Sequence, residues 1–144
     1  VEKTKKEGGD VLCGGKRPAG FNKGYYYEPT VFDNVQDNFT IIREEPFGPL
    51  VPLLTFSDFD EVVARANNHE LGLCSYVYTN NMEKAHRCTE LMETGCVALN
   101  TPAVAVAEAP FGGIKQSGYG REGGSMGIKD YLNIKYTHFG ISYE

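Results

Sequence analysis

The middle of the chain shows a regular alternation between strand-like and helix-like hydrophobic patterns. Residues 73–79 alternate as a strand does, 51–56 and 96–100 are short, mostly apolar segments typical of strands, and 81–93 carries an apolar face at helical spacing. Ser57 to Asp60 form a capping-box pattern that marks the start of a helix. The predicted order is strand 51–56, helix 57–68, strand 73–79, helix 81–93 and strand 96–100. This order is typical of a parallel sheet flanked by helices, so the sequence predicts an α/β fold.

Shorter patterns flank this α/β segment. They predict a helix end at 1–7, a short buried strand at 11–13, an edge strand at 25–32, one helical turn at 37–43, and a helix at 125–132. Residues 133–139 then alternate, with aromatic side chains on both faces. A strand of that kind usually needs a partner sheet, so we expect it to pair with another sheet.

A glycine-rich stretch, residues 109–124, follows the last predicted strand of the α/β segment. Six of its sixteen residues are glycine, but the large side chains of Phe111, Tyr119 and Arg121 are interleaved among them. A flexible linker would be rich in serine and small polar residues instead, so we expect an ordered loop that packs. Within it, 118–123 matches the dinucleotide fingerprint GxGxxG. Neither a buried strand before it nor room for a βαβ unit after it is present, so we interpret the match as accidental.

Composition limits the possible classes of function. A length of 144 residues predicts one domain, and a net charge of −5 with interspersed signs gives no indication of binding to nucleic acid or to an anionic membrane. Residues 1–7 are a charged run, unlike a signal peptide. The cysteines form no CxxC pair and have no histidine at ligand spacing, so no metal site is predicted. We expect all of them to be buried, reduced thiols of a cytoplasmic protein: Cys13, Cys74, Cys88 and Cys96.

Several motifs together carry a family resemblance. They are GYYYEPTV at 24–31, EEPFGP at 44–49, Asn100, and PFGGIKQSG at 110–118. In this order they resemble the C-terminal part of the NAD(P)-dependent aldehyde dehydrogenase superfamily, over nearly the whole chain. The segment 127–136 is most similar to the succinate-semialdehyde dehydrogenase branch. The resemblance implies the C-terminal part of an α/β catalytic domain at 1–131, with an oligomerisation strand and tail at 132–144 of a homodimer or homotetramer.

The same resemblance implies roles for individual residues. Glu45 matches the carboxylate that accepts hydrogen bonds from the nicotinamide-ribose hydroxyls of NAD or NADP, and Phe47 matches an aromatic residue beside the nicotinamide ring. Without the family resemblance, we would interpret Glu45 as an N-cap-like acid and Phe47 as a core aromatic residue. Phe111 matches a wall of the substrate tunnel, and 101–109 the segment that shapes its end. Ala105 and Val106 stand where succinate-semialdehyde dehydrogenases carry a serine, which favours a less polar aldehyde.

The mechanism that the resemblance implies is nucleophilic. A cysteine attacks the aldehyde, the thiohemiacetal passes a hydride to NAD(P)+, and water hydrolyses the thioester. The nucleophile should lie on the order of a hundred residues before Glu45, but only 44 residues precede it. We therefore expect a fragment that contains no catalytic residue and is inactive alone. Two alternatives are a non-catalytic assembly module of the same fold and a small stand-alone nucleotide binder.

Overall fold

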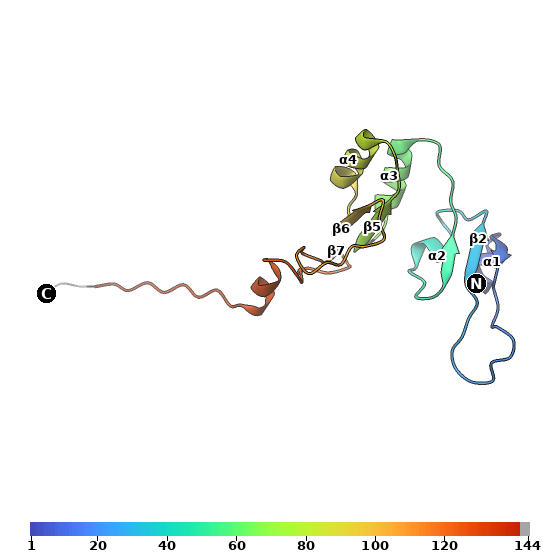
Figure 1. The fold of residues 1–144 in the computed structure, drawn as a ribbon, viewed down its shortest axis with the longest axis horizontal. Coiled ribbons are helices and arrows are strands. Elements are labelled where there is room, and N and C mark those ends of the chain that lie inside the picture. The colour runs from blue at the N-terminus through green and yellow to red at the C-terminus, as the bar shows by residue number, and fades with distance from the viewer. Residues whose placement is uncertain (142–144) are drawn as a thin grey trace. The chain divides into compact units, whose positions relative to one another are not determined.

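The computed structural model describes residues 1–141, which belong to two compact units, Val1–Arg65 and Ala66–Glu144 (Figure 1). Each strand pairing within the described residues joins two strands of the same unit. Each unit forms its own small sheets, and the boundary between the two units falls within a helix, α3 (Phe59–Asn67).

The first unit is built on a three-stranded sheet. Its elements are α1 (Glu2–Lys6), β1 (Asp10–Cys13), β2 (Thr30–Asp33), α2 (Thr40–Arg43) and β3 (Leu50–Pro52), followed by α3. The central strand β2 pairs antiparallel with β1 and parallel with β3. The one-turn helix α2 therefore lies on the crossover between two parallel strands, as the predicted helical turn at 37–43 indicated.

The core of this unit forms between the sheet and α2. Phe32, Val35, Phe39 and Ile41 are buried together, and Phe32 is completely inaccessible to solvent. By contrast, β1 is not the buried strand that its apolar residues predicted, because Leu12 is 59% exposed. The reason is topological: β1 is an edge strand that has β2 as its only strand partner in the described chain.

The second unit contains the predicted strand–helix–strand unit. Its elements are β4 (Leu71–Gly72), β5 (Cys74–Val77), α4 (Met82–Leu91), β6 (Cys96–Leu99), β7 (Ile114–Lys115) and the 3₁₀ helix η1 (Gly127–Tyr131). β5 and β6 pair in parallel, and α4 connects them. The parallel α/β prediction is confirmed here. The antiparallel pair β4–β7 has too few residues for a periodic signal and was not predicted.

Both predicted helices have side-chain caps. The Asn81 side chain accepts a hydrogen bond from the backbone N–H of Lys84 at the start of α4. At the start of α3, Asp58 Oδ1 accepts one from the N–H of Glu61 at 2.9 Å, so the cap lies one residue after Ser57, where the capping-box pattern placed it. On its apolar face α4 buries Ala85 and Cys88.

The glycine-rich stretch is ordered, as predicted, but it packs through its backbone and Arg121, whereas Tyr119 is fully exposed. A methyl group on Gly95 would collide with the carbonyl oxygen of Gly112, so the two backbones approach each other too closely for a side chain. The hydroxyl of Ser117 accepts a hydrogen bond from the N–H of Gly72 at 2.9 Å. Residues 118–123 follow a two-residue antiparallel strand and open no α-helix. This context does not support a Rossmann fingerprint.

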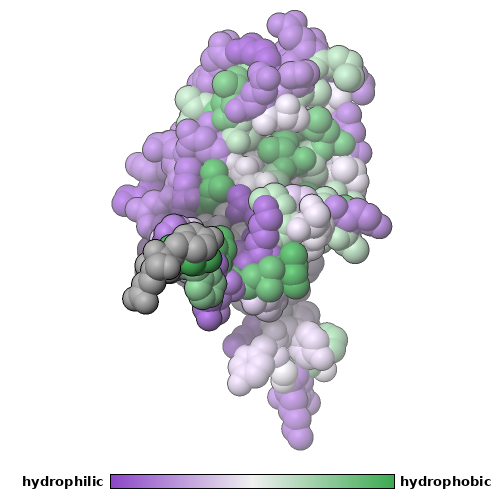
Figure 2. Space-filling view, turned by 90° about the vertical axis from the view of Figure 1, so that its left-hand side faces the viewer, coloured by the Kyte–Doolittle hydropathy of each residue, from purple (hydrophilic) through white to green (hydrophobic). Residues whose placement is uncertain are grey.

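The C-terminal segment forms no strand within the described residues. Residues 132–141 belong to no helix or strand, and Ile134, Tyr136 and Phe139 are at least 83% exposed. Since a strand exists only when its backbone pairs with another, the alternating pattern at 133–139 cannot produce one in a chain without a partner edge. Figure 2 shows further apolar side chains exposed among polar ones on the face that it presents. No helix within residues 1–141 is long and apolar enough to cross a bilayer.

Candidate functional site

The loop that carries Glu45 and Phe47 is held at both ends. At its start, the N–H of Glu44 donates to the carbonyl of Thr40 in α2 at 2.8 Å. At its end, Pro49 O accepts a 2.8 Å hydrogen bond from the N–H of Thr30 in β2, just before β3 begins. Between these anchors, Gly48 N–H donates to Pro46 O at 2.8 Å and closes a tight turn. The two prolines and the glycine therefore form an ordered loop between a helix and a strand.

Within this loop, both predicted cofactor residues face solvent. Glu45 is exposed, and among the described residues its carboxylate has no hydrogen-bond or ion-pair partner. Both of its oxygens are free to accept hydrogen bonds, which suits the two adjacent hydroxyls of a ribose. Phe47 is 96% exposed, so it is not a core aromatic of this unit. The structure thus places an exposed carboxylate and an exposed aromatic ring two residues apart on one loop.

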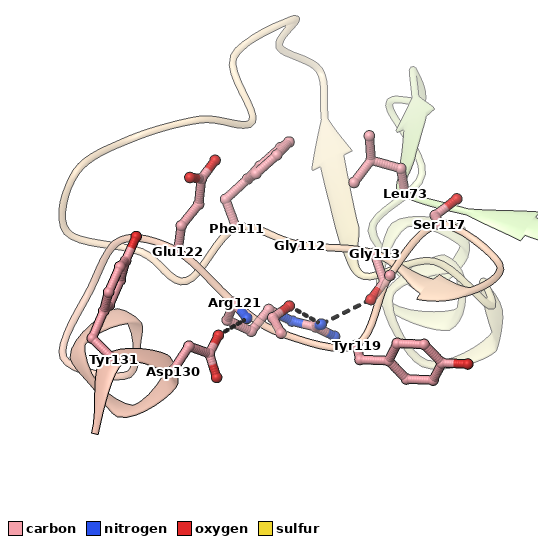
Figure 3. Close-up of a pocket in the computed structure, with 12 residues that line it drawn as sticks. Leu73, Phe111, Gly112, Gly113, Ser117, Tyr119, Arg121, Glu122, Asp130 and Tyr131 are labelled. Carbon is pink, nitrogen blue, oxygen red and sulfur yellow. Dashed lines mark hydrogen bonds between the residues drawn. The ribbon is translucent and has the colours of Figure 1, made fainter. Parts of the chain in front are cut away.

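Phe111 lines a pocket of about 320 Å³ in the second unit (Figure 3). Its backbone makes two hydrogen bonds with Glu122, at 2.7 and 2.8 Å, which fix the position of the half-buried ring. The same pocket is lined by Leu73, which directly precedes β5, and by Tyr131 in η1. This open pocket therefore combines apolar and aromatic side chains with charged ones.

Arg121 shapes the polar side of this pocket. Its Nη1 donates to the carbonyl oxygens of Gly113 and Gly120, both at 2.8 Å, and its backbone N–H donates to Asp130 Oδ2 at 2.8 Å (Figure 3). These bonds hold the glycine-rich stretch in a closed loop. Sequence reasoning did not identify Asp130 or Tyr131 as pocket residues, because no spacing rule connects η1 to Phe111. The only available signal was the arginine within a run of glycines.

Ala105 is exposed and lies outside the set of residues that line the Phe111 pocket. Its segment, 101–109, forms no helix or strand but is tied to the glycine-rich stretch, because the N–H of Gly124 donates to Ala107 O at 2.8 Å. The structure thus connects the segment and Phe111 through the backbone, without placing Ala105 in the same pocket. Glu45 and Phe47 belong to the other compact unit.

The four cysteines are free thiols, but their burial differs from the prediction. Cys88 is buried in α4, Cys74 and Cys96 are half-buried, and Cys13 is exposed. Cys13 lies on the edge strand β1, which explains its exposure. Burial, together with its strand neighbour Cys96, raises the pKa of the Cys74 thiol. A thiol with a raised pKa stays protonated at neutral pH and is a poor nucleophile.

Comparison with known proteins shows one family along almost the whole chain. Residues 1–137 match the aldehyde dehydrogenase family. The chain is 44% identical over 144 residues to a chloroplastic betaine aldehyde dehydrogenase from Beta vulgaris, covering all of this chain and 29% of the relative. The chain thus spans less than a third of the length of that curated relative.

Solved structures agree. An NAD+ complex of an aldehyde dehydrogenase from Bacillus cereus matches with a TM-score of 0.88 and 45% identity, over 93% of this chain and 27% of that one. A succinate-semialdehyde dehydrogenase from Burkholderia pseudomallei matches with a TM-score of 0.87 and 41% identity, over 94% of this chain and 28% of that one. These matches do not single out the succinate-semialdehyde branch. The fold is that of part of the α/β catalytic domain, and the chain belongs to the aldehyde dehydrogenase family.

Proposed function

We propose that this chain is the part of an NAD(P)+-dependent aldehyde dehydrogenase that positions the nicotinamide half of the cofactor. The observation that carries the proposal is the exposed Glu45 carboxylate, which has no partner among the described residues and stands in a loop anchored at both ends. When bound, the cofactor supplies the hydride acceptor. Glu45 accepts hydrogen bonds from the ribose hydroxyls, and Phe47 covers one side of the ring.

The test is Glu45→Gln in the enzyme that contains this chain. The amide has one acceptor oxygen instead of two, so the ribose is held less well and the reacting carbon is misplaced. We expect pre-steady-state hydride transfer to slow by about tenfold or more, with a smaller change in cofactor dissociation constant. The matched control is Glu44→Gln, which changes the neighbouring exposed carboxylate. Unchanged hydride transfer, with only thioester hydrolysis slowed, would contradict the proposed role.

The isolated chain should produce no NAD(P)H from aldehydes. Cys88 is buried, and the raised pKa of Cys74 keeps its thiol protonated. Neither residue has the properties of a catalytic nucleophile. The measurement is absorbance at high protein concentration with NAD+ and with NADP+. Turnover that is abolished by alkylating any one of the cysteines would overturn this expectation.

For the aldehyde, the segment 101–109 favours a neutral or cationic substrate over succinate semialdehyde. It contains no lysine or arginine, and its one charged side chain is the acidic Glu108. A distal carboxylate would find no cation in this segment, whereas a trimethylammonium group, as in betaine aldehyde, would meet no repulsion. We expect kcat/KM for betaine aldehyde to exceed that for succinate semialdehyde. Ala105→Arg should reduce the ratio of these two kcat/KM values. A higher kcat/KM for succinate semialdehyde than for betaine aldehyde in the unaltered enzyme would contradict the proposed substrate preference.

Assembly and location follow from the same proposal. The enzyme is a homodimer or homotetramer in which the strand at 133–139 pairs with a sheet of a neighbouring subunit, and its free thiols suit a reducing compartment such as the cytoplasm.

A further inference from the structure

The short helix α2 begins without a cap of its own. Its N-cap residue, Phe39, makes no side-chain hydrogen bond to the first turn. The missing acceptor comes instead from Glu7, which lies 33 positions before Thr40, the first residue of α2. The Glu7 carboxylate accepts hydrogen bonds from the backbone N–H of Thr40, at 3.1 and 3.2 Å, and from its hydroxyl at 2.6 Å. A charged acceptor at the start of a helix makes stronger hydrogen bonds than a neutral one.

Glu7 itself is held firmly. It is the residue that ends α1, and its N–H donates to Lys3 O at 2.9 Å. The following turn is closed by a hydrogen bond from the N–H of Gly9 to Thr4 O at 2.9 Å, and Thr4 is buried. The carboxylate of Glu7 is thus presented by a fixed turn, although the side chain is exposed to solvent.

Thr40 connects this contact to the cofactor loop. Its N–H and hydroxyl bind Glu7, and its carbonyl oxygen accepts the N–H of Glu44 at 2.8 Å. Glu45 is the next residue, and because it precedes Pro46 its own backbone is restricted to extended conformations. The direction in which Glu45 leaves α2 is therefore set by how the single turn of α2 is held.

The apolar core also holds α2. Phe39, the N-cap residue, and Ile41 are buried in the core cluster, which keeps α2 packed but offers no hydrogen-bond acceptor to the free N–H groups of its first turn. A helix of four residues has few hydrogen bonds of its own to resist fraying. Glu7 supplies that acceptor at the N-terminus of α2.

We propose that Glu7 is a positioning residue for Glu45, acting through Thr40 and the single turn of α2. This inference rests on the proposed role of Glu45 in cofactor binding. Glu7 touches neither cofactor nor substrate in this scheme. It fixes the loop so that the Glu45 carboxylate is already aimed when the ribose arrives.

The first test measures the loop in the chain itself, by amide hydrogen exchange. Glu7→Ala should raise exchange at the hydrogen-bonded amides of Thr40, Glu44 and Gly48 by about tenfold, because the capping acceptor is lost. The matched control is Glu2→Ala, which removes another α1 glutamate that contacts Lys5 and not α2. Glu7→Gln keeps one acceptor oxygen and should restore much of the protection. Equal exchange in the Glu7→Ala and Glu2→Ala variants would overturn the proposal.

The second test is a double-mutant cycle in the enzyme that contains this chain, at a temperature where all variants remain folded. Glu7→Ala should lower kcat with little change in KM for the aldehyde, and it should lower kcat no further when Glu45→Gln is already present. Thr40→Val, which removes only the hydroxyl, should give a smaller effect in the same direction. If Glu45→Gln slows hydride transfer and Glu7→Ala lowers kcat by the same factor with and without Glu45→Gln, the two residues act independently. Glu7 then has a merely structural role. If Glu45→Gln itself has no effect, the proposed function fails together with this inference.

Discussion

Arg65 holds Asp37 through two parallel hydrogen bonds, from Nε to Oδ2 and from Nη2 to Oδ1, both at 2.8 Å. Its third nitrogen, Nη1, donates at 3.0 Å to the carbonyl of Thr55 and to the carboxylate of Glu61. Arg65 lies in α3, whereas Asp37 precedes α2 and Thr55 follows β3. One guanidinium therefore joins three segments of the first unit, a geometry that lysine cannot reproduce.

This pair predicts a specific titration. The hydrogen bond and charge of Arg65 outweigh burial and hold the pKa of Asp37 below its ordinary value of 3.8. A carboxyl whose pKa is lower in the folded state contributes stability above its unfolded pKa and loses it as the pH falls through the folded pKa. We expect Asp37 to titrate below 3.8 by carboxyl NMR. The contribution of Asp37 to the free energy of unfolding should disappear in acid, below the pH of that midpoint.

The control for the Asp37 titration is Arg65→Gln, which keeps a hydrogen-bonding group but removes the charge. In this variant the pKa of Asp37 should return toward its ordinary value, and the acid dependence of stability should weaken. An Asp37 midpoint that is the same in both proteins would show that Arg65 is not the cause of the shift.

Lys115 makes a comparable junction in the second unit. Its Nζ donates to the carbonyls of Asn67 and His69, at 2.7 and 3.1 Å, and pairs with the Glu93 carboxylate at 2.6 Å. Lys115→Met keeps most of the length of the side chain but removes the ammonium group, so these acceptors lose their donor. We expect a loss of about 1–3 kcal/mol in the free energy of unfolding, measured by urea titration. Lys129→Met, at an exposed position, is the control, and an equal loss there would refute the assignment.

Gly95 should not tolerate a side chain. The Cβ of Gly95→Ala would meet the Gly112 carbonyl, so one of the two backbones has to move. We expect a loss of about 1–3 kcal/mol of stability in a thermal unfolding measurement, together with changed NMR shifts across the glycine-rich stretch. Gly140→Ala, where a Cβ meets open space, should have no effect. Unchanged shifts at Gly112 would mean that the close approach does not constrain the stretch.

Much of the fold could be predicted because its elements have local causes. The Asp58 and Asn81 caps and the apolar face of α4 fix two helices, and the strands between them follow from alternation. Burial was harder to predict. Cys13 sits in an apolar sequence context but lies on an edge strand, and only the pairing order reveals that it is exposed.

The candidate site could be predicted only through resemblance. Nothing in the spacing of Glu45 and Phe47 distinguishes a ligand-binding pair from a structural turn, and their exposure became visible only in the structure. Glu7 could not be found from the sequence at all, because its partner Thr40 is 33 residues away and no periodicity connects them. Such a contact forms only because the fold brings the end of α1 next to the start of α2.

The last prediction concerns residues 133–144 in the enzyme that contains this chain. Ile134, Tyr136 and Phe139 are at least 83% exposed here, and the alternation at 133–139 suits a strand that has no partner edge in the described chain. Pairing with a sheet of a second subunit would satisfy the backbone and cover the apolar side chains. We therefore expect deletion of 133–144 to lower the oligomeric state in sedimentation velocity and to reduce thermal stability. The matched control keeps the length but replaces Ile134 and Tyr136 by serine, which preserves the backbone and removes apolar burial. This variant should weaken the assembly without abolishing it. If both variants sediment as the unaltered enzyme does, the segment is not the assembly element.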